Sequence, residues 1–356
     1  MTPTVQLPRR RLLGIACLLA AAPPGLAACS TPGASAEGAA TSSGATSASS
    51  TTAPPTAWVT PRELPAGWGS GEDDGVFPRT VVHASGSTTI ATEPIRVAVI
   101  STGQMDAALT LGVVPVGSTA GDGADTVPAY LLTGFADRAA QLAAVAELGD
   151  RSEPNLEALA ALAPDLILMN SAAKDVTELY DTMSAIAPTV ITRGTGLYWK
   201  QDFQLLADAL GRRQQAQQWL ADHHERAAEL GAGLSTVPTV SLLRKNGDRV
   251  RVFGVASFSG SVVEDAGLLR PQAQSFTDET SRDISAEELD LVEGDWLFHA
   301  TQGGDESEFT SMPLWPALDV VRTGHAVEVD DDVFYLNTGP TAARSILEQL
   351  EGTLSA

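Results

Sequence analysis

From residue 95 onward the chain alternates short β-branched segments with amphipathic segments, and this alternation constrains the possible fold more than any other feature. Residues 95–100 have the continuous apolar character of a buried strand. Apolar side chains at helical spacing follow in residues 105–111, and a second strand is predicted at 113–117. The same order repeats as far as residue 192. Strands that alternate with helices indicate an α/β lobe with a largely parallel sheet.

A long helix predicted over residues 212–233 separates this region from a second region of the same kind. The helix has about 22 residues and would be roughly 33 Å long. After Pro238, strands and helices alternate again and end in a helix near residues 342–354. We therefore predict an α/β protein with two Rossmann-like lobes, at residues 76–211 and 234–356, whose mostly parallel sheets are joined by one long rigid helix.

The N-terminus has the parts of a secretory signal: arginines at positions 9–11, a short apolar run and small residues before Cys29. The apolar run is too short to span a membrane. The segment Leu26-Ala27-Ala28-Cys29 resembles the cleavage site of bacterial lipoprotein signals, in which the cysteine carries lipid after cleavage. The other cysteine, Cys17, lies within the segment that would be removed. The arginines suit either general or twin-arginine export.

Residues 29–75, which follow the predicted signal at 1–28, are mostly Ser, Thr, Ala, Gly and Pro, and this composition predicts a disordered tether. The net charge of the chain is −22. Such an acidic protein is a poor partner for nucleic acid and for anionic lipid surfaces. We therefore expect an extracytoplasmic protein that is held at the cell membrane by lipid on Cys29.

Several segments, taken in order, resemble the class of ABC-transporter substrate-binding proteins that capture iron–siderophore complexes, cobalamin or heme. The segments are GSTTIATEP at 86–94, DAALTLGVVPVG at 106–117, EPNLEALAALAPDLIL at 153–168, AIAPTV at 185–190, DAGL at 265–268, Trp315, GHAV at 324–327 and GPTAA at 339–343. The resemblance implies two α/β lobes joined by one stiff helix. It also implies a monomeric binding protein, not an enzyme, which captures a ferric siderophore between lobes that move little and delivers it to an ABC permease.

The predicted helix at 155–162 carries a candidate for contact with the permease. Asn155 is a plausible N-cap, which places Glu157 in the first turn on the outer surface. An acidic residue in a first turn also has the ordinary explanation of a favourable helix dipole. The resemblance implies that Glu157 contacts an arginine of the permease. It gives Glu287 the same role in the second lobe, with Glu288 as the other candidate.

Ligands of open α/β sheets bind beyond the carboxyl ends of the strands, so the loops that follow the predicted strands should hold the binding site. The oxygens of a ferric siderophore already coordinate its metal. Such a ligand therefore needs aromatic walls and donors such as arginine, and no metal ligands from the protein. Each residue chosen on this ground is equally suited to plain packing or surface exposure. The candidate ligand contacts are Arg193, Tyr198, Trp199, Phe258, Tyr335, Tyr130 and Asn170.

Other functions have less support in the sequence. The adjacent His223 and His224 fall on the long predicted helix, where neighbours point about 100° apart, so no bare metal site is predicted. Neither a Gly-Lys pair of a phosphate-binding loop nor a Gly-x-Ser-x-Gly nucleophile motif is present. Cobalamin or heme remains the nearest alternative ligand, since one Tyr or His suffices for heme. A tethered hydrolase is the distant alternative.

Overall fold

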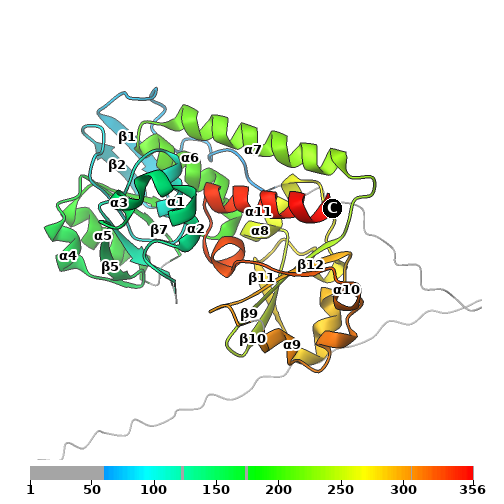
Figure 1. Cartoon of the computed structure of the whole chain (residues 1–356). Helices are drawn as coiled ribbons and strands as arrows, with labels where there is room; N and C mark the ends of the chain where they lie inside the picture. The colour runs from blue at the N-terminus through cyan, green and yellow to red at the C-terminus, as the bar shows by residue number, and fades with distance from the viewer. Residues whose placement is uncertain (1–59, 122–123, 173–174, 306, 356) are drawn as a thin grey trace, which may run out of the picture. The chain divides into compact units, whose positions relative to one another are not determined.

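The computed structural model describes residues 60–121, 124–172, 175–305 and 307–355 (Figure 1). The predicted signal, Cys29 and the tether as far as residue 59 lie outside the described residues. No helix in the described ranges is both long enough and apolar enough to cross a membrane.

In the described part of the chain, the first lobe is built on a six-stranded sheet with the order β6-β5-β4-β3-β7-β8. Strands β5, β4, β3, β7 and β8 run parallel to one another. Strand β6, at the edge of the sheet, is antiparallel to β5. Their bounds are β3 (Val97–Val99), β4 (Gly117–Ala120), β5 (Ala146–Asp150), β6 (Glu153–Pro154), β7 (Leu166–Asn170) and β8 (Thr189–Thr192). A parallel sheet is covered on both faces, so Leu166 to Met169 of β7 are at most 1% exposed.

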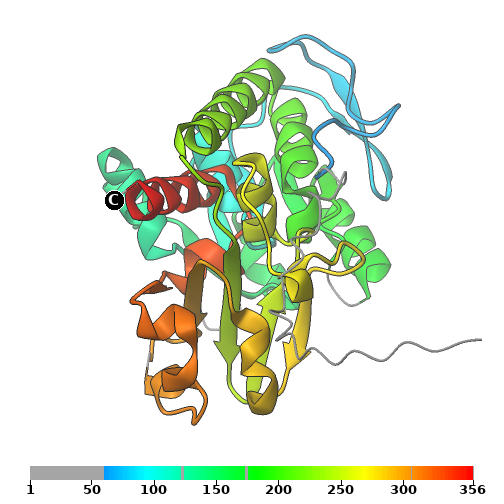
Figure 2. The same cartoon turned by 90° about the vertical axis from the view of Figure 1, so that its right-hand side faces the viewer.

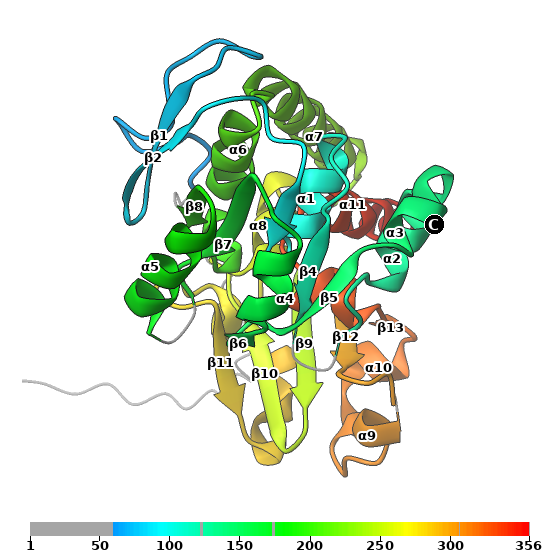
Figure 3. The ribbon, with the colours of Figure 1, turned by 90° about the vertical axis from the view of Figure 1, so that its left-hand side faces the viewer.

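Helices cover the two faces of this sheet. The helices α1 (Gln104–Thr110) and α6 (Trp199–Ala209) pack against one face, and α4 (Leu156–Ala161) and α5 (Val176–Ile186) pack against the other (Figure 3). The N-cap predicted at Asn155 is present, since its Oδ1 accepts the N–H of Ala158 at 2.9 Å. The lobe also contains α2 (Ala129–Gly134), η1 (Ala136–Arg138), α3 (Ala139–Leu142), η2 (Gly196–Tyr198) and the antiparallel hairpin β1 (Arg79–His83) and β2 (Gly86–Ile90).

In the described residues, the second lobe is built on a five-stranded sheet with the order β11-β10-β9-β12-β13. Strands β9, β12 and β13 are parallel, whereas β10 and β11 are antiparallel to their neighbours. The sheet is therefore mixed, because a tight turn at Gly247 (φ 56°) returns the chain directly from β9 into β10. The bounds are β9 (Val240–Asn246), β10 (Arg249–Phe253), β11 (Ser281–Ile284), β12 (Trp296–Thr301) and β13 (Ala326–Glu328).

The helices of the second lobe also lie on two faces. On one face are η4 (Ala286–Val292), α9 (Ser307–Thr310), η5 (Trp315–Ala317) and α10 (Asp319–Arg322). On the other are α8 (Phe258–Asp265), η6 (Asp332–Leu336) and α11 (Pro340–Leu354), and the short turn η3 (Gln272–Gln274) follows α8. The connection between the lobes is α7 (Arg213–Gly233), one residue shorter than the predicted helix at 212–233 (Figure 2).

The last helix, α11, is fixed to the first lobe by a buried carboxylate. Asp106 of α1 accepts the N–H groups of Thr341 at 2.8 Å and Ala342 at 3.0 Å, and so caps the start of α11. Gly339 permits this contact, because a Cβ at that position would lie 2.4 Å from Asp106. The two lobes are therefore linked by α11 as well as by α7.

Residues 60–75 differ from the tether that we expected over 29–75. Gly69 pairs with Val82 of β1 through hydrogen bonds of 2.9 and 3.0 Å. Ser70 donates its N–H and hydroxyl to Asp208 at 2.6 and 2.8 Å. The segment is polar on average, but it contains two large apolar side chains, Leu64 and Trp68, which pack against the main hydrophobic core. Burial of these side chains stabilises the segment on the folded domain.

Candidate functional site

A cavity lies at the carboxyl ends of β3, β5 and β7, where the sequence placed the binding loops. Its volume is about 100 Å³. The wall includes Ser101, Arg151 and Asn170, with Met169 and Leu179 as apolar members. The Ser101 hydroxyl accepts the Asn170 N–H at 3.0 Å, and the Asn170 Oδ1 accepts the Ala172 N–H at 3.1 Å. Of the predicted ligand contacts, Asn170 lies in this wall.

Two arginines stand side by side on the second sheet. Arg244 of β9 is in register with Arg251 of β10. The hairpin that carries them lies below the carboxyl ends of the first-lobe strands (Figures 1 and 3). Arg244 donates two hydrogen bonds of 2.6 Å to Asp331. Among the described residues, the Nε of Arg251 is buried and has no hydrogen-bond partner. Burial, and then the charges of Arg244 and Arg249, lower the pKa of Arg251.

The charges of Asp283 and Asp331 raise the pKa of Arg251 but do not outweigh burial and the neighbouring arginines. Asp331 accepts its hydrogen bonds from Arg244, and the Nε of Arg251 has no partner among the described residues. Arginine presents a planar set of donors that matches carboxylate groups in pairs, so this position favours an anion. Sequence reasoning missed Arg244 and Arg251. The available signal was a pair of charged side chains in the region after Pro238, where strands and helices are predicted to alternate.

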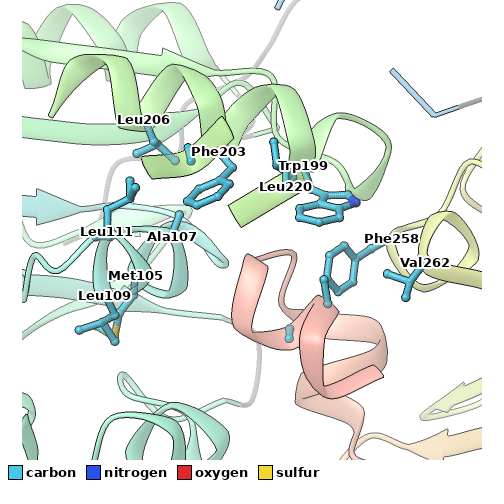
Figure 4. Packing of buried hydrophobic residues seen from close by; sticks show 14 of the residues in the cluster. Met105, Ala107, Leu109, Leu111, Trp199, Phe203, Leu206, Leu220, Phe258 and Val262 are labelled. Atoms are coloured by element: carbon cyan, nitrogen blue, oxygen red, sulfur yellow. The ribbon is translucent and has the colours of Figure 1, made fainter. Parts of the chain in front are cut away.

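Trp199 and Phe258 lie in the packing between the lobes and not in the cavity wall (Figure 4). Their residues are 1% and 5% exposed, and their ring centroids are 5.5 Å apart. The indole N–H of Trp199 donates to the Ser261 hydroxyl at 2.9 Å. Of the two roles considered for Trp199 and Phe258, packing and ligand contact, the structure shows packing. Their rings form the contact between α6 and α8.

Arg193 and Tyr198 contact each other near the end of β8. The guanidinium of Arg193 lies 4.5 Å from the ring centre of Tyr198 and 4.8 Å from that of Trp68. Asp202 accepts the main-chain N–H groups of Arg193 at 3.0 Å and Gly194 at 2.9 Å. Burial raises the pKa of Asp202 to about 7, although these hydrogen bonds act in the opposite direction. The loop from 193 to 198 is therefore held in place by a buried acid.

The two remaining tyrosines among the candidate ligand contacts use their hydroxyl groups within the protein. Tyr335 donates to the Phe298 carbonyl at 2.8 Å and accepts the Leu243 N–H at 3.2 Å. Tyr130 donates to Asp106 at 3.1 Å. Tyr130 also lines a groove of about 600 Å³ that shares no lining residue with the cavity beside Asn170. The structure thus does not bring Tyr130 and Asn170 into one site.

The carboxylates that are candidates for permease contact differ in the hydrogen bonds that they accept. Glu157 and Glu287 are exposed in the first turns of α4 and η4. Glu288 instead accepts the Ser285 N–H at 3.0 Å and the Ser285 hydroxyl at 2.9 Å, and forms a capping box. Glu287 is therefore the better available carboxylate in the second lobe.

The described histidines are not part of an arrangement that could hold a metal ion. In the ranges that the structure describes, no group of three or more His, Cys, Asp or Glu side chains is arranged to hold a metal ion. His223 and His224 both approach Asp265, with Nε2 atoms 3.4 and 3.7 Å from its oxygens. Burial, against the opposing charge of Asp265, lowers the pKa of His224 to about 4.

Comparison with known families identifies the chain. Residues 97–333 match the family described as periplasmic binding protein. The chain belongs to the periplasmic binding protein family. This family consists of substrate-binding proteins and not of enzymes. The match spans both lobes and α7, and it confirms the family that the sequence segments resembled.

Relatives and solved structures of periplasmic binding proteins agree with this membership. A probable siderophore-binding lipoprotein, YfiY of Bacillus subtilis, is 32% identical, and the match covers 77% of this chain and 86% of the relative. The Fe(3+) dicitrate-binding periplasmic protein FecB of Escherichia coli is 25% identical, with 76% and 88% covered. The crystal structure of Staphylococcus aureus SirA complexed with staphyloferrin B has a TM-score of 0.66 at 25% identity, covering 78% of this chain and 98% of that one. The predicted two-lobed α/β fold is confirmed.

Proposed function

We propose that this periplasmic binding protein captures an anionic ferric siderophore between its lobes and delivers it to an ABC importer. The observation that carries the proposal is the unpartnered, buried Nε of Arg251, next to Arg244 on the hairpin below the first-lobe cavity, within the described residues. The relatives support the ligand class, since one is named for ferric dicitrate and one solved structure holds staphyloferrin B. The protein itself acts as a receptor and catalyses no reaction.

The ligand class can be tested by titration of the whole mature protein. Tryptophan fluorescence would be followed while ferric citrate, a ferric hydroxamate, a ferric catecholate, cobalamin or heme is added. We expect a ferric complex with free negative charge to bind at micromolar or lower concentration. Binding of cobalamin or heme in its place would overturn the proposed ligand. Turnover of an ester or peptide, with none of these ligands bound, would overturn the receptor function.

The anchor and the location belong to the same proposal. Cys29 would carry the lipid that keeps the receptor at the outer side of the cell membrane, and two Bacillus subtilis relatives, YfiY and YhfQ, are named as lipoproteins. A receptor held beside its permease needs only weak docking contacts. We expect Cys29→Ala to release the protein into the medium with its ligand affinity intact. Retention of the variant at the membrane would contradict lipid anchoring at this residue.

Glu157 and Glu287 would make the docking contacts with the permease. Both carboxylates are exposed, and neither forms an ion pair with another of the described residues. The double variant Glu157→Gln with Glu287→Gln should bind the ferric complex normally and lose uptake of labelled iron. Glu178→Gln, an exposed acid in the first turn of α5, is the matched control and should leave uptake unchanged. Normal uptake in the double variant would remove the docking role.

A further inference from the structure

Residues 60–70, which we call the strap, run between the two lobes before the first strand begins. At one end the strap binds α8 of the second lobe. Thr60 donates its N–H and its hydroxyl to Glu264 at 3.2 and 2.8 Å. Arg62 donates to Asp265 at 3.0 Å. These bonds join positions more than 200 residues apart in the sequence.

The rest of the strap binds the first lobe along α6. The side-chain amides of Gln201 and Gln204 donate to the carbonyls of Glu63 and Arg62. Further along, Ser70 donates to Asp208 near the end of the same helix. Successive strap residues therefore hold α8 and α6 at once, although these helices belong to different lobes.

Asp265 is the point where four elements meet. Its side chain is fully buried, with an exposed fraction of 0%. The Nζ of Lys200, from α6, lies 2.6 Å away, and Arg62 approaches from the strap. His223 and His224 approach from α7 at 3.4 and 3.7 Å. A buried carboxylate is stable only while such partners remain, so its position depends on both lobes and on the strap.

The strap also reaches the loop that follows β8. Trp68 stacks on the guanidinium of Arg193, which stacks on Tyr198 in turn. Trp68 and Leu64 pack against the main core. A shift of the strap would therefore disturb the lobe interface and the loop at 193–198 together.

We propose that the strap is a positioning element that fixes the second lobe against the first through Asp265, so that the ligand-binding surfaces of the two lobes are held at a set separation. The covalent connection through α7 does not by itself fix the orientation of α8, and α11 and the contact between Trp199 and Phe258 already restrict it. The strap adds a further connection, within the segment that was predicted to be part of the tether. This inference goes beyond the proposed function, because it concerns the lobes in the absence of any ligand.

The test is hydrogen exchange of the whole, ligand-free protein, read by mass spectrometry. Arg62→Gln removes the strap's charge from Asp265. We expect exchange in α8 and α6 to rise roughly tenfold or more, because a hydrogen bond between charged groups is lost. Arg62→Lys should restore most of the protection. The control is Arg249→Gln, which breaks an exposed pair with Asp283 within the second lobe and should leave α6 and α8 unchanged.

Two results would overturn the proposal. If exchange rises in the strap alone while α8 stays protected, the strap merely lies on the surface. If exchange rises equally in both lobes, including β11 and β5, Arg62 contributes to general stability and positions nothing. Should Arg62→Gln fail to fold, Thr60→Val removes one strap bond to α8 and is judged by the same regional pattern. Because no ligand is present, a wrong ligand assignment would not affect the outcome.

Discussion

The two sides of the junction between the lobes use the same kinds of side chain in opposite ways. On the helical side, Trp199, Lys200 and Asp265 are fully buried and each has a partner across the interface. On the side of the strand ends, Asn170 and Arg251 are half-buried, and the Nε of Arg251 is buried without a hydrogen-bond partner among the described residues. The side chains on the helical side thus hold the two lobes together, whereas those at the strand ends remain available to a ligand. We call the second group the receptive side.

This difference shows that residue type alone does not indicate a ligand contact. Trp199 and Arg251 are both residues that a siderophore could use, but the partners of Trp199 are already inside the protein. What distinguishes a binding residue is an unmet hydrogen-bonding or charge requirement. Substitutions on the two sides should therefore separate stability from affinity.

The largest effect is expected from Trp199→Ala on the helical side. Removing a large buried aromatic residue leaves a cavity and should lower the free energy of unfolding by roughly 3–5 kcal/mol. Urea denaturation followed by circular dichroism measures the change. Tyr198→Ala is the matched control, because the adjacent ring is partly exposed and should cost much less. Equal losses for the two variants would mean that the helical side is not built as described.

On the receptive side, Arg251→Gln should affect affinity and leave stability nearly unchanged. Loss of a charged donor to an anionic ligand should raise the Kd by roughly 10- to 100-fold. Isothermal titration with the ferric complex measures it. Arg282→Gln, in the same lobe, is the control, since Arg282 is exposed and already paired with Asp278 and Glu279. An unchanged Kd in Arg251→Gln would place the ligand elsewhere.

Asp202, which holds the loop at 193–198, should make the stability of the folded protein depend on pH. Its folded pKa is about 7, against an ordinary value of 3.8. At pH values between these two pKa values, Asp202 of the folded protein keeps a proton that the unfolded chain has released. The free energy of unfolding should therefore fall as the pH rises, by at most about 1.4 kcal/mol per pH unit. Asp202→Asn should remove this contribution. Urea unfolding midpoints of the wild type and of Asp202→Asn at several pH values would measure this contribution. The prediction is contradicted if the wild type becomes more stable, relative to the variant, as the pH rises.

The smallest effects concern the exposed acids. Glu288→Gln weakens the capping box with Ser285 and should cost about 0.5–1 kcal/mol of stability. Glu157→Gln and Glu287→Gln should change stability by less than about 0.5 kcal/mol, because nothing in the described structure depends on them. Thermal unfolding of the three variants provides the comparison. A large loss for Glu287→Gln would assign that residue a structural role.

Much of the fold could be predicted from local sequence. The helix predicted over 212–233 agrees with α7 to within one residue, because apolar residues recur along it at helical spacing. Strand β4 was expected at 113–117 and lies at Gly117–Ala120, since the apolar segment before it is a connection that packs on the core. Strand β5 was missed because only Leu148 is buried in an otherwise polar segment. Its pairing with β4 is a tertiary effect that no local pattern reveals.

The site was predictable only as a set of loops. The rule that ligands bind at strand ends led to Asn170, and the cavity is found there. This rule does not indicate which aromatic side chains line the cavity. Trp199 and Phe258, for example, are each oriented by contact with a helix of the other lobe. Arg244 and Arg251 become a pair only through the register of a hairpin. Such information lies in contacts between segments and not within any one of them.

The cap that Asp106 places on α11 has a consequence for the cooperativity of folding. Apolar side chains of α1 and of α11 belong to one core, although 235 positions separate Asp106 from Thr341. The first lobe therefore cannot bury this part of its core until α11 has packed against it. We expect the two lobes to unfold together in one transition and not as separate modules.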